Sequence, residues 1–297
     1  MDVRKELKER TAQAEAVVER YLPEESGHQK TIFQAMNYSV RAGGKRLRPL
    51  LMQETYRLFG GQGKEIEPFM AAIEMIHTSS LIHDDLPCMD NDELRRGKPT
   101  TWVKFGYDMA VLAGDALMIY AFETAARACG MVSGEAAGRV AAAMGLLARK
   151  TGIYGMIGGQ VVDVELTGHP VNRQQLDFIY RLKTGALLEA SMMTGALLAG
   201  ADQARMKLVE QMAAAVGMAF QIQDDILDVT GTQEQLGKPV LSDEKNHKTT
   251  YVTLEGLKKA RQDVEELSAK AVDLLHQLPG ENPFLEELVR MLVTREN

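Results

Sequence analysis

Residues 66–90 read IEPFMAAIEMIHTSSLIHDDLPCMD, and this stretch decides the fold class. Apolar residues recur from Ile66 to Leu81 at the three- and four-residue spacing of an amphipathic helix. Pro87 fits poorly inside a continuing helix, so we expect this helix to end near Asp84. The stretch therefore predicts a buried helix that delivers acidic side chains at its carboxyl end.

A second stretch, residues 209–228, repeats this arrangement. An apolar helical pattern again leads into an acid cluster, Asp224-Asp225-Ile-Leu-Asp228. Residues 105–128 and 139–148 are rich in alanine and strongly helix-forming. Convincing alternating strands are absent, and no composition shift marks a linker. The chain is predicted to be all-α: one helical domain over residues 1–297, with ligands in the core between facing helices.

Composition narrows the functional classes. The 297 residues are 45% apolar and 25% charged, which is ordinary for a globular protein. A net charge of −7 argues against nucleic acid as a partner, although local charge still permits an anionic substrate. Only Cys88 and Cys129 are present, and the charged N-terminal segment lacks the apolar core of a signal peptide. We expect a cytoplasmic protein without a membrane span, since no uninterrupted apolar run is long enough.

The acid clusters need compensation, because a buried carboxylate is costly without a positive partner. Asp224 and Asp228 are four apart and share a helix face with Gln221. Asp84 and Asp90 are six apart, so they converge only if the chain loops back after the helix. Carboxylate oxygens suit magnesium, which completes its shell with water and phosphate. Solvated acids at two helix ends are the alternative interpretation of either cluster alone.

Basic segments lie near both clusters. In Gly43-Gly44-Lys45-Arg46-Leu47-Arg48-Pro49, glycines allow close approach to an anion, and Lys45 and Arg48 can grip a diphosphate. Arg95-Arg96-Gly97 is a similar signal, and His77 lies two turns before Asp84 on the same face. Each signal is weak alone, since a basic turn is usually solvated and a lone helix histidine is usually a satisfied core residue.

The order in which these motifs occur together is far more specific than any one motif alone. The chain carries Gly-Gly-Lys-x-x-Arg-Pro, then Asp-Asp-x-x-x-x-Asp with Arg-Arg-Gly, then Lys183-Thr184, then Phe220-Gln221-x-x-Asp-Asp-x-x-Asp, then Lys238. This order resembles the trans-isoprenyl diphosphate synthases, most of all the short-chain bacterial farnesyl and geranylgeranyl diphosphate synthases. The resemblance runs from about Lys30 to Lys248. It implies a helical bundle with a deep central cavity, and a homodimer.

The resemblance implies a role for each matching position. Isopentenyl diphosphate would be held by Lys45, Arg48, His77 and Arg96. The allylic diphosphate would be held by Arg95, Lys183, Thr184, Gln221 and Lys238, with Lys248 as an addition. Magnesium, as three ions with substrate bound, would be held by Asp84, Asp90, Asp224 and Asp228. Asp85 and Asp225 would complete the catalytic set with Asp84, Asp90, Arg95, Lys183 and Asp224.

The implied reaction is a prenyl transfer. The allylic diphosphate (dimethylallyl, geranyl or farnesyl) ionises, and the double bond of isopentenyl diphosphate attacks the carbocation. A proton then leaves, so no protein nucleophile is required. Apolar walls exclude water, which would quench the cation.

Product length rests on the residues before the first acid cluster. Ser80 and Ser79 lie four and five residues before Asp84, roughly 6–7.5 Å along the helix axis. The family's fifteen-carbon enzymes tend to carry a bulky aromatic residue at the fifth position, whereas Ser79 is small. The sequence slightly favours geranylgeranyl over farnesyl diphosphate as the final product. In the alternative interpretation, Phe33, Met36 or Met118 closes the cavity floor.

Two other functions share some of these features. A class I terpene cyclase ionises a prenyl diphosphate but needs no second diphosphate site at Lys45, Arg48 and Arg96. A non-catalytic regulatory subunit of a synthase would be expected to have lost one acid cluster, and both are intact. Assays with and without isopentenyl diphosphate, on the protein alone, separate these alternatives.

Overall fold

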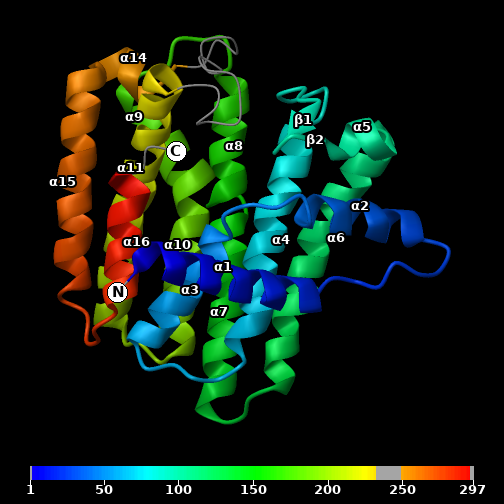
Figure 1. Ribbon diagram of the computed structural model, residues 1–297, viewed down its shortest axis with the longest axis horizontal. Coiled ribbons are helices and arrows are strands. Elements are labelled where there is room, and N and C mark those ends of the chain that lie inside the picture. The colour runs from blue at the N-terminus through cyan, green and yellow to red at the C-terminus, as the bar shows by residue number, and fades with distance from the viewer. Residues whose placement is uncertain (1, 232–248, 295–297) are drawn as a thin grey trace. The chain divides into compact units, whose positions relative to one another are not determined.

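The computed structural model describes residues 2–231 and 249–294, and its regular structure is almost entirely helical (Figure 1). The one sheet in these residues is a hairpin of two-residue strands, which the sequence did not predict. The all-α expectation is confirmed. The described chain forms two compact units, Met1–Gln53 with Gly63–Met144 and Glu54–Gln62 with Gly145–Asn297. The single domain predicted for residues 1–297 stays a prediction.

The first unit is built around a pair of apolar helices. Its elements are α1 (Val3–Arg20), α2 (Lys30–Val40), the start of α3 (Leu47–Leu58), α4 (Ile66–Asp84), β1 (Leu94–Arg95), β2 (Lys98–Pro99), α5 (Thr101–Phe105), α6 (Tyr107–Ala126), η1 (Arg127–Gly130) and most of α7 (Glu135–Thr151). Helices α4 and α6 pack along each other, and α2 and α5 pack against α6 (Figure 1). The helix predicted to end near Asp84 ends at that residue.

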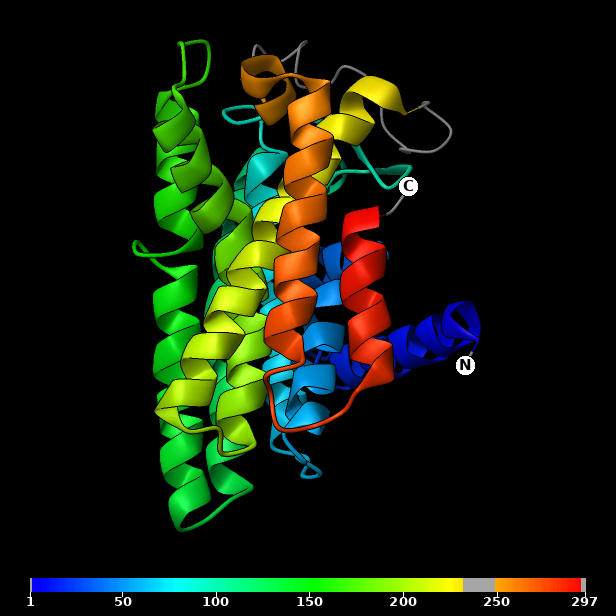
Figure 2. The same ribbon diagram turned by 90° about the vertical axis from the view of Figure 1, so that its left-hand side faces the viewer.

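The second unit holds the other acid cluster. Its elements are the ends of α3 and α7, α8 (Met156–Glu165), α9 (Arg173–Ile179), the π-helical turn η2 (Tyr180–Gly185), α10 (Ala186–Leu198), α11 (Gln203–Thr230), α14 (Tyr251–Glu255), α15 (Leu257–Leu275) and α16 (Pro283–Thr294). Helix α11 lies between α10 and α15 in Figure 2 and contacts both. Asp202 caps the start of α11, where its side chain accepts from the Arg205 N–H.

One helix meets the length and hydropathy of a membrane span. Residues Tyr107–Gly130 join α6 to η1, with a mean hydropathy of 1.4 over the most apolar window. The sequence analysis treated residues 105–128 as helix-forming but found no uninterrupted apolar run long enough to span a membrane. A core helix of a globular protein meets the same two criteria, so the absence of a membrane span stays a prediction.

A buried ion pair fixes the basic loop between α2 and α3. Arg46 is 3% exposed and adopts a φ of +47°, in the left-handed region that non-glycine residues rarely occupy. Its guanidinium donates to Glu74 on α4 at 2.8 Å and to the Val40 carbonyl at 2.6 Å. Glu74 is 2% exposed and is compensated by Arg46, which also lies 3.3 Å from the exposed Glu15 carboxylate. The pair therefore ties the loop that carries Lys45 and Arg48 to α4.

Removing one member of this pair should be costly. We expect Glu74→Ala to lower the free energy of unfolding by about 3 kcal/mol, because the buried Arg46 charge then keeps only the longer contact to the Glu15 carboxylate, at 3.3 Å. The matched control is Glu19→Ala, which breaks the exposed Arg41–Glu19 pair and should cost less than about 1 kcal/mol. Urea unfolding of both variants makes the comparison. Equal losses would contradict a special role for the buried pair.

Candidate active site

The first acid cluster follows the carboxyl end of α4. Asp84 is the last residue of the helix, and Asp85 is its C-cap. The Asp90 N–H donates to the Asp84 carbonyl at 2.9 Å, and the Asn91 N–H donates to the Leu86 carbonyl at 3.1 Å. The chain after Leu86 thus loops back onto the helix end, as the six-residue spacing required. The backbone of Asp90 therefore lies beside that of Asp84.

Asp85 is compensated by an arginine from the hairpin. Its carboxylate is almost fully buried and accepts from Arg95 Nε at 2.7 Å, with Arg95 Nη2 at 2.5 Å. Burial raises the pKa of Asp85 to about 6, while the bond to Arg95 opposes that rise. Arg95 therefore holds the loop after α4 in place.

The hairpin also brings the two basic motifs together. Strands β1 and β2 are joined by Arg96 and Gly97, whose φ angles of +53° and +74° match a tight two-residue turn. This turn lays the Arg96 guanidinium against Gly44. A Cβ added to Gly44 would lie 2.8 Å from that guanidinium, and Gly44 has a φ of +135°, which side chains rarely adopt, so glycine suits this approach. The Gly43-Gly44-Lys45 loop and the Arg95-Arg96-Gly97 turn therefore form one basic cluster.

His77 faces the same cluster from α4. Burial lowers its pKa well below 6.5, and the nearby charges of Arg48, Arg96, Arg95 and Arg46 lower it further. The sequence interpretation weighed His77 as a core residue against a ligand. Several guanidinium charges around a neutral imidazole make this part of the first unit suited to an anion.

The second acid cluster occupies the last turns of α11. Gln221, Asp224, Asp225 and Asp228 all lie within one continuous helix, as their spacing predicted. Asp224 is half-buried, whereas Asp225 and Asp228 are 2% and 3% exposed. The Asp225 carboxylate accepts from the Tyr180 hydroxyl at 2.5 Å and from the Tyr251 N–H at 2.7 Å. These contacts join Asp225 to neighbouring elements of its own unit.

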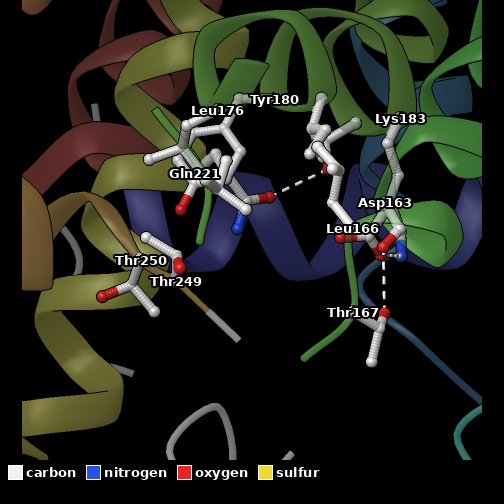
Figure 3. A pocket seen from close by; sticks show the side chains of 12 residues that line it. Asp163, Leu166, Thr167, Leu176, Tyr180, Lys183, Gln221, Thr249 and Thr250 are labelled. Atoms are coloured by element: carbon white, nitrogen blue, oxygen red, sulfur yellow. Dashed lines mark hydrogen bonds and ion pairs between the residues drawn. The ribbon is translucent and has the colours of Figure 1, made fainter. Parts of the chain in front are cut away.

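A pocket in the second unit is lined by three of the residues predicted to hold the allylic diphosphate, Lys183, Thr184 and Gln221 (Figure 3), whereas Arg95 lies in the first unit. Lys183 Nζ lies 2.6 Å from an Asp163 carboxylate oxygen, and the Thr184 hydroxyl donates to Gln221 Oε1 at 2.8 Å. Sequence reasoning missed Asp163. The available signal was Gly159, one helical turn earlier on the same face. A Cβ there would lie 2.2 Å from the Lys183 backbone nitrogen, so glycine lets α8 approach the turn that carries Lys183.

The remaining predicted positions divide as follows. Lys45 is exposed and Arg48 half-buried in the first unit, together with Asp84, Asp90 and Arg96. Lys238 and Lys248 lie outside the described residues. Within residues 2–231 and 249–294, no three His, Cys, Asp or Glu side chains are grouped closely enough to hold a metal ion. Carboxylates with hard oxygen donors still fit magnesium, which takes much of its shell from water and substrate phosphate.

Comparison with known proteins gives the family. A sequence model of the polyprenyl synthetase family matches residues 29–277. The chain belongs to the polyprenyl synthetase family. It is 45% identical over 268 residues to a chloroplastic geranylgeranyl pyrophosphate synthase of Catharanthus roseus, with 90% of this chain and 74% of that protein covered. It is 44% identical over 267 residues to a farnesyl diphosphate synthase of Geobacillus stearothermophilus, with 88% and 87% covered.

A solved structure gives the same assignment. The chain matches a geranyltransferase from Helicobacter pylori complexed with magnesium and isoprenyl diphosphate, with a TM-score of 0.84 and 32% identity. The match covers 99% of this chain and 97% of that one. Neither a terpene cyclase nor a non-catalytic subunit is favoured by these relatives. The all-helical isoprenoid synthase fold and the prenyltransferase class of this family member are thereby established.

The lowered pKa of His77 predicts a pH dependence of stability. Below pH 6.5 the unfolded chain binds a proton at His77 that the folded chain does not, so folding stability falls as the pH drops. Between about pH 7.5 and about pH 5.5, the wild type should lose about 1 kcal/mol more than His77→Gln. Urea unfolding at both pH values measures the difference. Equal losses in the two proteins would show that His77 titrates normally.

Proposed function

We propose that this chain condenses isopentenyl diphosphate with allylic diphosphates (dimethylallyl, geranyl and farnesyl) to make farnesyl and geranylgeranyl diphosphate. The main support is that each acid cluster has its own set of diphosphate-binding groups. In the first unit these groups are Lys45, Arg48, His77 and Arg96; in the second they are Lys183, Thr184 and Gln221. Two such sets suit two diphosphates, whereas a cyclase needs one. The printed names of the relatives agree with this reaction.

Different residues are proposed to bind each of the two diphosphates. Lys45, Arg48, His77 and Arg96 hold isopentenyl diphosphate through paired donors and positive charge. Arg95, Lys183, Thr184 and Gln221 hold the allylic diphosphate, whose carbon–oxygen bond breaks, with Lys238 and Lys248 as expected additions. The isopentenyl double bond then forms the new carbon–carbon bond, and the released diphosphate takes the departing proton.

Metal use fits the acidic side chains. Asp84 and Asp90, brought side by side by the loop after α4, would hold magnesium in the first unit, and Asp224 and Asp228 in the second. Bound magnesium would supply positive charge that stabilises the leaving diphosphate. The proposal includes three ions when substrate is bound. Asp85 is held by Arg95 and supports Asp84 and Asp90.

Product length is proposed to depend on the contact between α4 and α6. Ser79 is fully buried; its hydroxyl donates to the Ile76 carbonyl at 2.8 Å and lies 3.9 Å from Met118 Sδ on α6. Ser80, the other predicted position, donates to the His77 carbonyl. Because Ser79 is small, the flexible Met118 side chain beside it can move to make room for a longer prenyl chain. This arrangement supports geranylgeranyl diphosphate as the longest product.

The same proposal covers assembly and location. Leu112 and Ile119, seven residues apart on α6, are 55% and 70% exposed. A symmetric dimer is the commonest way to cover such a face, so we propose a homodimer. Cys88 and Cys129 are both free and exposed, which is consistent with the reducing cytoplasm.

A product assay tests the proposed function. Radiolabelled isopentenyl diphosphate, each allylic starter and magnesium are incubated with the protein alone, and the products are dephosphorylated and separated. The proposal predicts labelled fifteen- and twenty-carbon alcohols. Cyclic hydrocarbons formed without isopentenyl diphosphate would indicate a cyclase, and no product from the protein alone would indicate a non-catalytic subunit.

The two basic groups should differ in the substrate they serve. Arg48→Ala should raise the KM for isopentenyl diphosphate by roughly tenfold or more, because arginine grips a diphosphate through paired donors. Lys183→Ala should instead raise the KM for the allylic substrate. The control is Lys207→Ala on the exposed part of α11, which should change neither. Equal effects of Arg48→Ala and Lys183→Ala on both substrates would refute the division.

Adding bulk at position 79 should shorten the product. Ser79→Tyr places a ring where α4 meets Met118, and a packed apolar wall tolerates little added volume. We expect a shift from twenty toward fifteen carbons with turnover largely kept. Ser79→Ala, which removes only the hydroxyl, should leave the product unchanged. Identical chromatograms for Ser79→Tyr and the wild type would place the length control elsewhere.

Dimer formation predicts a particular mass. Light scattering at micromolar concentration should give about twice the 32.8 kDa of one chain. Replacing Leu112 and Ile119 together by lysine should shift the mass toward one chain, because charge at a buried interface is costly. A wild-type mass of one chain would contradict the homodimer.

A further inference from the structure

The turn that carries Lys183 and Thr184 has an unusual backbone. Residues Tyr180–Gly185 form a π-helical turn between α9 and α10, the only such turn in the described part of the chain. π-Helical turns are rare; they occur mostly as single turns within α-helices, and frequently at functional sites. Surrounding contacts hold this turn in place.

Two side-chain hydrogen bonds attach the turn to α11. The Tyr180 hydroxyl donates to Asp225 Oδ2 at 2.5 Å, and the Thr184 hydroxyl donates to Gln221 Oε1 at 2.8 Å. Tyr180 and Thr184 are four residues apart in the turn, and their partners Asp225 and Gln221 are four residues apart in α11. The earlier residue of the turn bonds the later residue of α11, so the two segments run antiparallel. The two bonds thus act as the rungs of an antiparallel ladder. The turn and the end of α11 are fixed together at two points.

Of these two hydrogen bonds, the one to Asp225 is the more buried. The carboxylate is 2% exposed, and its Oδ2 also accepts from the Tyr251 N–H at 2.7 Å, in the first turn of α14. Gln221 Nε2 lies 3.5 Å from its other oxygen. A buried carboxylate that receives donors from a hydroxyl and a backbone N–H is stabilised as an acceptor. Tyr180 and Tyr251 both belong to one apolar cluster with Ile222 and Ile226, which keeps water from these bonds.

We infer that Asp225 is a positioning residue: through the Tyr180 hydroxyl it fixes the π-helical turn and thereby the orientation of Lys183 and Thr184 toward the allylic diphosphate. The inference rests on the proposed function, which makes Lys183 and Thr184 the grip on that diphosphate. It separates Asp225 from its neighbour Asp224, which is proposed as a magnesium ligand. Adjacent aspartates on one helix then serve different purposes, since their side chains project about 100° apart.

The test uses two matched tyrosines. Tyr180→Phe removes only the hydroxyl that bonds Asp225 and should raise the KM for the allylic substrate roughly tenfold, the effect of losing one hydrogen bond to a buried charge. The KM for isopentenyl diphosphate and the half-saturating magnesium concentration should stay within about twofold of wild type. The control is Tyr251→Phe: its hydroxyl donates to Asp263 at 2.6 Å, away from Asp225, so the allylic KM should not change.

A double-mutant cycle and a metal titration complete the test. Tyr180→Phe combined with Asp225→Asn should raise the allylic KM no more than Asp225→Asn alone, because both remove the same bond. Asp224→Asn should raise the magnesium requirement, whereas Asp225→Asn should not. Thermal unfolding of each variant checks that it is folded at the assay temperature.

Three results would overturn the inference. The first is a Tyr180→Phe variant with the same allylic KM as Tyr251→Phe while Lys183→Ala does raise that KM; the proposed function then stands and only the inference fails. The second is an Asp225→Asn variant that raises the magnesium requirement as Asp224→Asn does, which would make Asp225 a metal ligand. The third is a Lys183→Ala variant without allylic bias, which would remove the proposed grip and the inference with it.

Discussion

A carboxylate taken out of water needs a positive charge or several donors beside it, and the positions of the main acidic side chains follow from this need. Glu74 is buried against Arg46, and Asp85 against Arg95. In the second unit, Glu189 is paired with Lys150, and Asp225 with the Tyr180 hydroxyl and a backbone N–H. Except for Asp85 and Arg95, which are ten residues apart, these side-chain pairings join segments at least 28 residues apart in the chain. The same contacts that offset desolvation therefore fix the loops and turns around the candidate site.

This constraint has a consequence for catalysis. Groups held by buried pairs do not need to reorganise when a substrate arrives, and such preorganised charge is the main source of electrostatic stabilisation in enzymes. Arg46 and Glu74 hold the loop that carries Lys45 and Arg48. Asp163 holds the Lys183 ammonium at 2.6 Å, so a diphosphate must compete with that carboxylate for the same charge. Ionisation of a prenyl diphosphate requires that the negative charge of the leaving diphosphate be stabilised, and it needs no protein nucleophile. Each acid cluster has a basic side chain fixed by an ion pair in its own unit, Arg95 in the first and Lys183 in the second.

Local features of the sequence predicted much of this arrangement. The helix end at Asp84 followed from Pro87, and the loop back to Asp90 followed from a spacing that no helix could accommodate. The residue types of the glycine- and arginine-rich segment alone, however, could not show that Arg46 is buried while its neighbour Lys45 is exposed. The contact between Tyr180 and Asp225 spans 45 residues and depends on packing between elements. Asp163 was missed for the same reason, because its partner lies 20 residues further along the chain.

The central claim is that magnesium-dependent binding of the proposed allylic diphosphate depends on each of the two acid clusters. Calorimetric titration with an unreactive allylic thiodiphosphate, with and without magnesium, measures this binding without turnover. The account predicts that magnesium tightens binding by at least about tenfold in the wild type and that Asp84→Asn and Asp224→Asn each abolish this gain. Binding in the wild type that is equally tight without magnesium, or an undiminished gain in both variants, would contradict it.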